Sequence, residues 1–328
     1  MKKIFALLLT AVMLLALTAC NTDPADKTDD GKYVVGVVQL APHPALDAAT
    51  QGFIDTLKAE LGEDNVEVKV EIAAGDTATC APIVNAFVAE DVDLIMANAT
   101  PALQAAVAAT TDIPILGTSV TEYGVALDIK DFNGTVGGNV SGTADLAPLK
   151  KQADMIKEWF PEAKNVGLLF CSAEANSKYQ VDTVQAYLEG LGYTCKQYPF
   201  ADSNEMQSVT QKAASESDVI YVPTDNTVAN ATGIVDGICQ PAKVPVIAGE
   251  EGICSGCGVA TLCISYYDLG AATAKMAVKV LKGEANISEM PIEYVAEEDL
   301  TPKYNKDICD ALGITPPEGY VAIEKSDK

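Results

Sequence analysis

Asp93-Leu-Ile-Met-Ala-Asn-Ala-Thr-Pro-Ala-Leu103 and Asp218-Val-Ile-Tyr-Val-Pro-Thr-Asp-Asn-Thr-Val228 follow one pattern at an offset of 125 residues, within a chain of 328 residues. Each segment starts with an aspartate, continues as an apolar run of strand length and ends in polar residues that suit the start of a helix. Ile113-Pro-Ile-Leu-Gly-Thr-Ser119 and Val244-Pro-Val-Ile-Ala-Gly-Glu250 correspond in the same way. We therefore expect two similar units in tandem.

Apolar runs of strand length alternate with amphipathic segments of helix length along both halves of the chain. This order is typical of parallel sheets built from βαβ units. The expected strands are residues 34–40, 66–73, 93–97, 114–119, 165–171, 194–199, 219–222 and 245–248. The expected helices are residues 45–61, 81–90, a helix opened by Pro101, and residues 146–160, 177–191, 206–215 and 268–281. The predicted fold is α/β, with two lobes that are each a doubly wound parallel sheet flanked by helices.

Two short segments are candidates for the connections between the lobes. Residues 134–142 are glycine-rich and extended, and residues 260–265 precede the last long helix. Connections this short predict hinge crossovers. We expect lobe I to comprise residues 33–143 plus about 268–290, and lobe II to comprise residues 144–267 plus about 291–328.

The charge of the chain excludes several classes of function. The net charge is -24, all of the cations are lysines, and His43 is the single histidine. A chain this acidic lacks the basic surface that binds nucleic acid or anionic lipid. The absence of arginine also disfavours a pocket for phosphate, because no guanidinium can form a bidentate pair.

The amino terminus predicts export and lipid anchoring. Lys2 and Lys3 precede an apolar run that is too short to span a bilayer, which is typical of a signal peptide, here residues 1–19. The run ends in Leu17-Thr-Ala-Cys20, which resembles the lipobox of bacterial lipoproteins. The resemblance implies cleavage before Cys20, acylation of that cysteine, as by palmitate, and tethering to the extracytoplasmic face of the membrane. Residues 20–32 are polar and acidic and are expected to be a flexible tether.

Eight further cysteines permit disulfides in an oxidising compartment, although the sequence does not define their pairing. Cys254 and Cys257 are separated by two residues, so a redox pair or a cysteine-only zinc site is an alternative. The spacing to Cys239 and Cys263 does not match a paired zinc motif, and a loop disulfide or unreactive thiols are favoured. We expect no metal and no cofactor.

Polar residues gather after the predicted strands, where parallel sheets bind ligands at their carboxyl ends and at helix amino termini. The candidate ligand-binding residues are His43, Asn98, Thr100, Thr118, Ser119 and Asn139 from the first half, and Glu174, Asn176, Ser177, Thr224, Asp225, Asn226 and Glu250 from the second.

Several of these candidates have a purely structural alternative. Thr100, Asn176 with Ser177, and Asp225 are good helix caps, and His43 between two prolines suits an exposed loop. Tyr123, Tyr266 and Tyr267 either line an aromatic pocket or pack near the hinge.

The residue types indicate the chemistry of the ligand. Hydroxyls, amides and helix amino termini hold a carboxylate without arginine, and one acid takes an ammonium. Thr100, Ser119, Asn176 and Ser177 are expected to hold the carboxylate, and Asp225 the amine. This pairing predicts a free α-amino acid.

The ordered motifs of the chain resemble ABC-transporter substrate-binding proteins of the tryptophan/tyrosine type, which have a type 1 periplasmic-binding fold. The matching segments are His43-Pro-Ala-Leu-Asp47, Ala99-Thr-Pro-Ala102, Gly138-Asn-Val-Ser-Gly142, Glu174-Ala-Asn-Ser177, Tyr221-Val-Pro-Thr-Asp-Asn-Thr-Val228 and Tyr266-Tyr-Asp-Leu-Gly270. They run in family order across residues 34–290, and the chain departs from the family pattern in the cysteine-rich stretch 254–263.

The resemblance implies a monomeric binding protein whose lobes close over a small ligand, with an aromatic or other apolar amino acid as the leading ligand. It also implies delivery of that ligand to an ABC permease with its ATPase. A sensor of the same fold that docks a receptor is the alternative. An extracytoplasmic hydrolase is disfavoured, because it would need His43 beside a nucleophile and the catalytic motifs of hydrolases are absent from the sequence.

Overall fold

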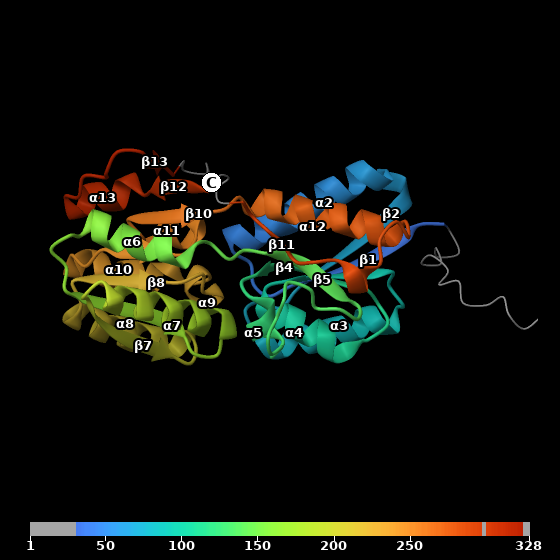
Figure 1. Ribbon diagram of the computed structural model, residues 1–328, viewed down its shortest axis with the longest axis horizontal. Coiled ribbons are helices and arrows are strands. Elements are labelled where there is room, and N and C mark those ends of the chain that lie inside the picture. The colour runs from blue at the N-terminus through green and yellow to red at the C-terminus, as the bar shows by residue number, and fades with distance from the viewer. Residues whose placement is uncertain (1–30, 297–299, 324–328) are drawn as a thin grey trace, which may run out of the picture.

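Two sheets, one in each lobe, organise the chain in the computed structural model (Figure 1). The structure describes residues 31–296 and 300–323. The predicted signal peptide, the lipidation site Cys20 and most of the predicted tether lie outside the described residues. Within the described residues, no helix is both long and apolar enough to cross a membrane.

The first sheet has six strands in the order β11-β5-β4-β3-β1-β2, all paired in parallel. The second has seven strands in the order β13-β12-β10-β9-β8-β6-β7, with one antiparallel pairing between β10 and β12. The strands are β1 (Tyr33–Gln39), β2 (Val66–Ile72), β3 (Leu94–Asn98), β4 (Ile115–Val120), β5 (Val140–Ala144), β6 (Asn165–Cys171), β7 (Thr194–Phe200), β8 (Val219–Val222), β9 (Val246–Ala248), β10 (Ala260–Cys263), β11 (Glu293–Tyr294), β12 (Thr301–Tyr304) and β13 (Val321–Ala322).

The sequence repeat corresponds to a repeat in space. Strands β5-β4-β3-β1-β2 and β10-β9-β8-β6-β7 have the same order in their sheets. Asp93 and Asp218, which begin the two repeated segments, also have the same task. A carboxylate oxygen of Asp93 accepts a hydrogen bond from the backbone N–H of Val34 at 2.6 Å, and one of Asp218 accepts from Asn165 at 2.8 Å. Each aspartate thus ties its strand to the first strand of its own lobe, and the predicted two-lobe α/β fold is confirmed.

Helices cover both faces of each sheet. In the first lobe α2 and α12 lie on one face and α3 and α4 on the other (Figure 1). In the second lobe α6, α7 and α13 cover one face and α8, α10 and α11 the other. The helices are α2 (Pro44–Leu61), α3 (Thr77–Ala89), α4 (Thr100–Ala109), α5 (Tyr123–Ala126), α6 (Leu149–Trp159), α7 (Ala175–Gly190), α8 (Ser203–Glu216), α9 (Asn226–Ala229), α10 (Thr232–Ala242), α11 (Glu251–Cys257), α12 (Tyr266–Leu281) and α13 (Lys306–Leu312), with 3-10 turns at Glu63–Asn65 and Ile287–Glu289.

The structure departs from the expected elements in a few places. Helix α3 begins four residues earlier than predicted, because the Asp76 side chain caps it by accepting from the N–H of Ala78. The sequence did not predict α5, α9, α10, α11 or α13. Four of these are short, and α10 contains glycine and proline, residues of poor helix propensity.

The connections between the lobes also differ in detail. Residues 140–144 form β5 inside the first sheet, so the chain crosses after them, at residues 145–148, rather than within the glycine-rich segment. Residues 260–263 likewise form β10 inside the second sheet. Strand β11 pairs with β5, which carries the first sheet past the boundary expected near residue 290.

Helices α2 and α12 cross at backbone contact in the first lobe. A Cβ added at Gly270 would lie 1.9 Å from the carbonyl oxygen of Ala49, and one at Gly52 would lie 2.0 Å from that of Tyr267. Glycine is therefore required on both helices for this close approach.

Replacing Gly270 with alanine should lower the free energy of unfolding by about 1–3 kcal/mol, because the helices must separate to admit a methyl group. Urea denaturation measures the change. Gly237→Ala in α10 is the matched control, since a Cβ there meets nothing within 4 Å. It should stabilise the protein by about 0.5–1 kcal/mol. Equal effects of the two substitutions would contradict this account of the helix crossing.

Candidate ligand-binding site

A small enclosed cavity of about 10 Å³ lies between the lobes, at the carboxyl ends of the strands. This is about the room that one water molecule needs. The first lobe contributes side chains from the start of α2 and the end of β4, and the second contributes the starts of α7, α9 and α11. The lining residues are His43, Ala45, Leu46, Ser119, Thr121, Asp145, Asn176, Thr224, Asp225, Asn226, Ala229, Glu250 and Tyr266.

Four buried polar atoms without a hydrogen-bond partner belong to side chains that line this cavity. They are His43 Nδ1, Ser119 Oγ, Asp145 Oδ1 and Asn176 Oδ1. The exposed fractions of these four residues are 4–6%, so solvent does not satisfy the atoms. Because buried polar groups in native proteins are nearly always hydrogen-bonded, these four atoms require a polar partner in the cavity, either a water molecule or a polar group of a ligand.

The backbone explains how Ser119 enters the cavity. Ser119 has a φ of +54°, in the left-handed region that residues with side chains seldom adopt. The pairing of β4 with β5 shifts register between Gly117 and Val120, around this residue. The local irregularity therefore places Ser119 among the cavity walls instead of leaving it in a regular strand.

Asp145 was not among the candidates from the sequence. It follows β5 in the crossover, and its N–H donates to the carbonyl of Val120. The Tyr266 hydroxyl donates to Asp145 Oδ2 at 2.8 Å, and the Thr121 hydroxyl is a further partner. Burial raises the pKa of Asp145, although these hydrogen bonds oppose the shift. The signal that could identify Asp145 is a lone acid just after the glycine-rich segment, but the crossover was expected at residues 134–142, before Asp145.

Asp225 lines the cavity, but both of its carboxylate oxygens are already engaged. Oδ1 accepts from the N–H of Val228 at 2.9 Å, which caps α9, and Oδ2 accepts from the N–H of Cys171 at 2.7 Å. Burial, followed by the nearby charge of Glu174, raises the pKa of Asp225 to about 7. The capping alternative thus describes the observed contacts of Asp225.

Glu250 caps the start of α11, as Asp225 caps the start of α9. Its carboxylate accepts from the backbone N–H groups of Gly252 and Ile253. Burial raises the pKa of Glu250 to about 7, and these backbone hydrogen bonds lower it by less. The backbone amides of the first turn of α11 thus satisfy the Glu250 carboxylate.

Glu174 lies beside the cavity rather than in its wall. It accepts from the N–H groups of Asn226 and Thr227, from the Thr227 hydroxyl and from the side-chain amide of Asn226. The side-chain nitrogen of Asn176 donates to the carbonyl of Thr224 at 3.0 Å and to Glu174 at 3.3 Å, whereas its Oδ1 has no partner. Glu174 therefore orders the start of α9.

The contact between His43 and Asn226 joins the two lobes. His43 Nε2 lies 3.3 Å from Asn226 Oδ1, and since an amide oxygen only accepts, Nε2 carries the proton. Burial lowers the pKa of His43, which favours the neutral ring, so Nδ1 is an acceptor. No side chain caps α2, which leaves the amides of Ala45 and Leu46 at the cavity without an intrahelical partner.

Six candidates from the sequence lie outside the lining of the cavity: Glu174, Asn139, Asn98, Thr100, Thr118 and Ser177. The side-chain amide of Asn98 donates to the Leu46 carbonyl and the Thr50 hydroxyl, and so fixes the first turns of α2 against β3. Thr100 and Ser177 are buried in the first turns of α4 and α7, and Thr118 contacts the hydroxyl of Thr143.

The expected position of Asn139 was wrong. Asn139 precedes β5, at the amino end of the strand, and its amide donates to the carbonyls of Thr110 and Ile113. The cavity lies at the opposite, carboxyl edge of the sheet. Of the three tyrosines, Tyr266 lines the cavity, Tyr123 is buried beside Gly117, and Tyr267 is exposed.

The eight cysteines within residues 31–296 and 300–323 are all free thiols, and these residues contain no cluster of ligands suited to a metal ion. Burial raises the pKa of Cys254 and Cys257 well above the usual range of a thiol. The thiols are therefore protonated at neutral pH, which agrees with unreactive thiols and not with the loop disulfide that was the other favoured alternative.

The sequence matches the family described as ABC transporter substrate binding protein over residues 34–326. A curated protein of Clostridioides difficile named tyrosine-binding protein is 34% identical over 322 residues, which cover 95% of this chain and 92% of that protein. A solved ABC domain of Streptococcus pneumoniae in complex with L-Trp is 34% identical with a TM-score of 0.83, covering 88% of this chain and 99% of the other.

A further solved relative is in a ligand-free, open form. The ligand-free, open structure of a substrate-binding protein with adhesive properties from Clostridium difficile is 36% identical and covers 90% of this chain and 100% of its own. Its TM-score is nevertheless only 0.68. The present structure therefore superposes better on the L-Trp complex than on the open form.

The buried carboxylates predict an unusual dependence of stability on pH. The pKa of Asp225 and Glu250 is about 7 in the folded protein, above the values of 3.8 and 4.5 expected on unfolding. Between these values the folded state binds more protons than the unfolded state, so stability falls as the pH rises. The free energy of unfolding should be about 2–4 kcal/mol greater at pH 5.5 than at pH 7.5.

Urea denaturation at the two pH values measures this difference. His43, whose pKa is lowered on folding, acts in the opposite sense below pH 6.5, so His43→Gln should enlarge the difference. A His43→Gln protein that is equally stable at both pH values would contradict the predicted titration of the buried acids.

Proposed function

The chain belongs to the family of ABC transporter substrate-binding proteins, and from that premise we propose that its ligand is a free α-amino acid with an aromatic side chain. The convergence of four unpartnered buried atoms on one cavity between the lobes carries this proposal. The names of two relatives, one tyrosine-binding and one in complex with L-Trp, support the aromatic class.

The unpartnered atoms favour an ammonium group. Asp145 Oδ1, Asn176 Oδ1 and His43 Nδ1 are acceptors, and an ammonium offers three N–H donors. Asp145 supplies the opposite charge, whereas the oxygens of Asp225 are engaged by backbone amides. The proposed partner of the amine is therefore Asp145, in place of Asp225.

The start of α2 favours the carboxylate of the same ligand. The amides of Ala45 and Leu46 lie at the positive end of an 18-residue helix without a capping side chain. Ser119 adds a hydroxyl that is free to donate. This arrangement replaces the arginine that the chain lacks.

The size of the cavity implies opening and closing. A volume of about 10 Å³ cannot admit an amino acid, so the lobes must separate for entry and close again around the ligand. Residues from both lobes line the cavity, so a bound ligand contacts both and favours the closed arrangement by its differential affinity.

We also propose delivery of the ligand to a permease and ATPase, which the family description, ABC transporter substrate binding protein, supports. Anchoring through a lipid on Cys20 remains part of the proposal, as does action as a monomer. The alternative, a sensor that docks a receptor, predicts the same ligand site. Catalysis by His43 is not proposed, because its described side-chain partner is the amide oxygen of Asn226 and not a nucleophile.

Identifying the ligand tests the proposal directly. Mass spectrometry of small molecules released from the purified protein, followed by calorimetric titration with the twenty amino acids, should give L-tyrosine, L-tryptophan or L-phenylalanine as the tightest ligand. Binding of a sugar or of no amino acid would refute it.

Asp145→Asn should weaken binding of that amino acid at least about 30-fold, because a buried charge pair loses one partner. The analogue without the amine, such as 3-(4-hydroxyphenyl)propionate for tyrosine, should bind the two proteins about equally. Asp225→Asn serves as the matched comparison and should mainly lower stability, through the lost cap of α9. If Asp145→Asn keeps the native affinity while Asp225→Asn loses it, the amine lies at Asp225.

A further inference from the structure

A second, larger pocket that is partly open to solvent, here called the chamber, adjoins the small cavity on the side of α2 and α11. Its volume is about 580 Å³, within the range of pockets that bind small molecules. The two spaces share Ala45, Ala229, Glu250 and Tyr266 in their walls. Another chamber of about 490 Å³, on the opposite side, shares Asn226 with the cavity.

The wall between the small cavity and the larger chamber is suited to the passage of a ring. Ala45 of α2 and Ala229 of α9 come from different lobes, and each contributes a single methyl group. Tyr266 is 6% exposed, and its hydroxyl is held by Asp145, so its ring is fixed in the shared wall. A fixed aromatic face favours contact with a second ring.

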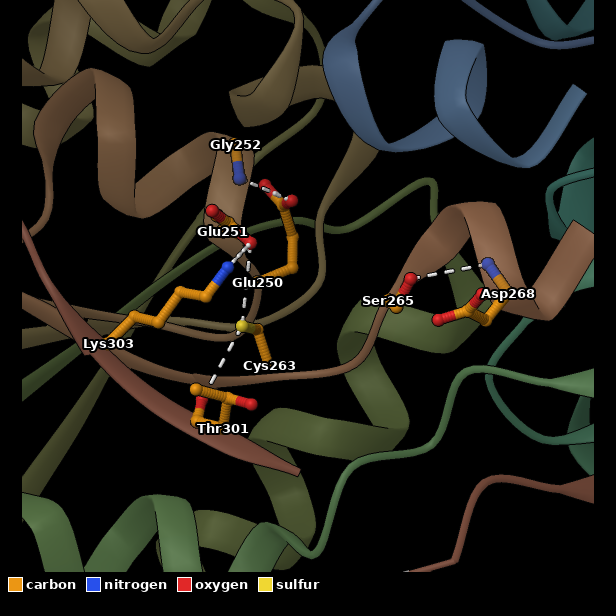
Figure 2. A network of polar contacts seen from close by, with 8 residues as sticks. All are labelled: Glu250, Glu251, Gly252, Cys263, Ser265, Asp268, Thr301 and Lys303. Atoms are coloured by element: carbon orange, nitrogen blue, oxygen red, sulfur yellow. Dashed lines mark hydrogen bonds and ion pairs between the residues drawn. The ribbon is translucent and has the colours of Figure 1, made fainter. Parts of the chain in front are cut away.

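The far wall of the chamber is polar. Lys303 of β12 donates to a carboxylate oxygen of Glu251 at 2.7 Å, and both side chains line the chamber (Figure 2). The Cys263 thiol donates to Glu251 at 3.6 Å and also contacts the carbonyl of Thr301. Burial raises the pKa of Cys263 to about 12, so the thiol remains a donor at neutral pH.

From these contacts we infer that the chamber between α2, α11 and β12 is the side-chain subsite, and that the Glu251–Lys303 pair selects a ring that carries a hydroxyl group. A phenol both donates and accepts a hydrogen bond, so it complements a neighbouring carboxylate and ammonium. The ring passes between Ala45 and Ala229 along Tyr266. This inference rests on the proposed function and narrows its ligand to L-tyrosine or a similar phenolic amino acid.

A pair of leucine substitutions tests which chamber receives the ring. Ala229→Leu should fill the passage and weaken binding of L-tyrosine and L-phenylalanine alike by at least about tenfold. Ala231→Leu is the matched control, because Ala231 is also a half-buried alanine but lines the opposite chamber. The affinities of this variant for L-tyrosine and L-phenylalanine should change less than about twofold. Weakened binding by Ala231→Leu with native binding by Ala229→Leu would overturn the assignment.

The role of the ion pair is tested by removing both charges together, which leaves neither partner unpaired. Glu251→Gln/Lys303→Met should weaken L-tyrosine about tenfold and leave L-phenylalanine within about twofold, so that the preference for tyrosine is lost. Glu216→Gln/Lys196→Met removes an ion pair on β7 and α8 and should keep the native ratio. Circular dichroism and thermal unfolding establish that each variant is folded.

The outcomes separate this inference from the proposed function. If the native protein binds no amino acid, the proposed function fails. If the native protein binds aromatic amino acids but the ratio of tyrosine to phenylalanine affinity is the same in Glu251→Gln/Lys303→Met, the subsite assignment fails and the proposed function stands.

Discussion

Buried carboxylates between the two lobes must be stabilised without solvent and without an arginine partner. Asp145, Glu174, Asp225 and Glu250 are each at most 4% exposed, and none of the described lysines lines the cavity. Backbone amides at the starts of α9 and α11 satisfy three of these carboxylates. Asp145 keeps one oxygen without a partner. An unpartnered oxygen on a buried carboxylate is costly, and under the proposed function the ammonium group of the ligand would satisfy it.

The duplicated architecture explains why the two lobes contribute different chemistry to one site. Asp93 and Asp218 have the same role in the two repeats, because each accepts a hydrogen bond from the first strand of its own sheet. Thr100 and Asp225 occupy equivalent positions in the repeat but have diverged: Thr100 is buried within α4, and Asp225 caps α9. The first lobe thus offers free donors, at α2 and Ser119, whereas the second offers mainly carboxylates and amides.

Sequence reasoning located the lobes and most of the strands, and seven of its thirteen candidate residues lie in the cavity wall. It did so because strand ends and helix starts are local features, and parallel sheets bring them to one edge. It failed for Asn139, since a shift of a few residues in the expected strand exchanges one edge of the sheet for the other. It also missed Asp145 because the position of the crossover was misjudged.

The sequence by itself determined the two-lobed α/β fold, the acidic character of the site and the absence of a guanidinium for the ligand carboxylate. These properties follow from composition and from short local patterns that recur at an offset of 125 residues. Only the tertiary structure decided which acid is free to meet a ligand. Asp225 and Asp145 are both single acids beside a strand end, and they differ in whether backbone amides from distant segments reach their oxygens. That difference depends on contacts between residues far apart in the chain, which no local pattern encodes.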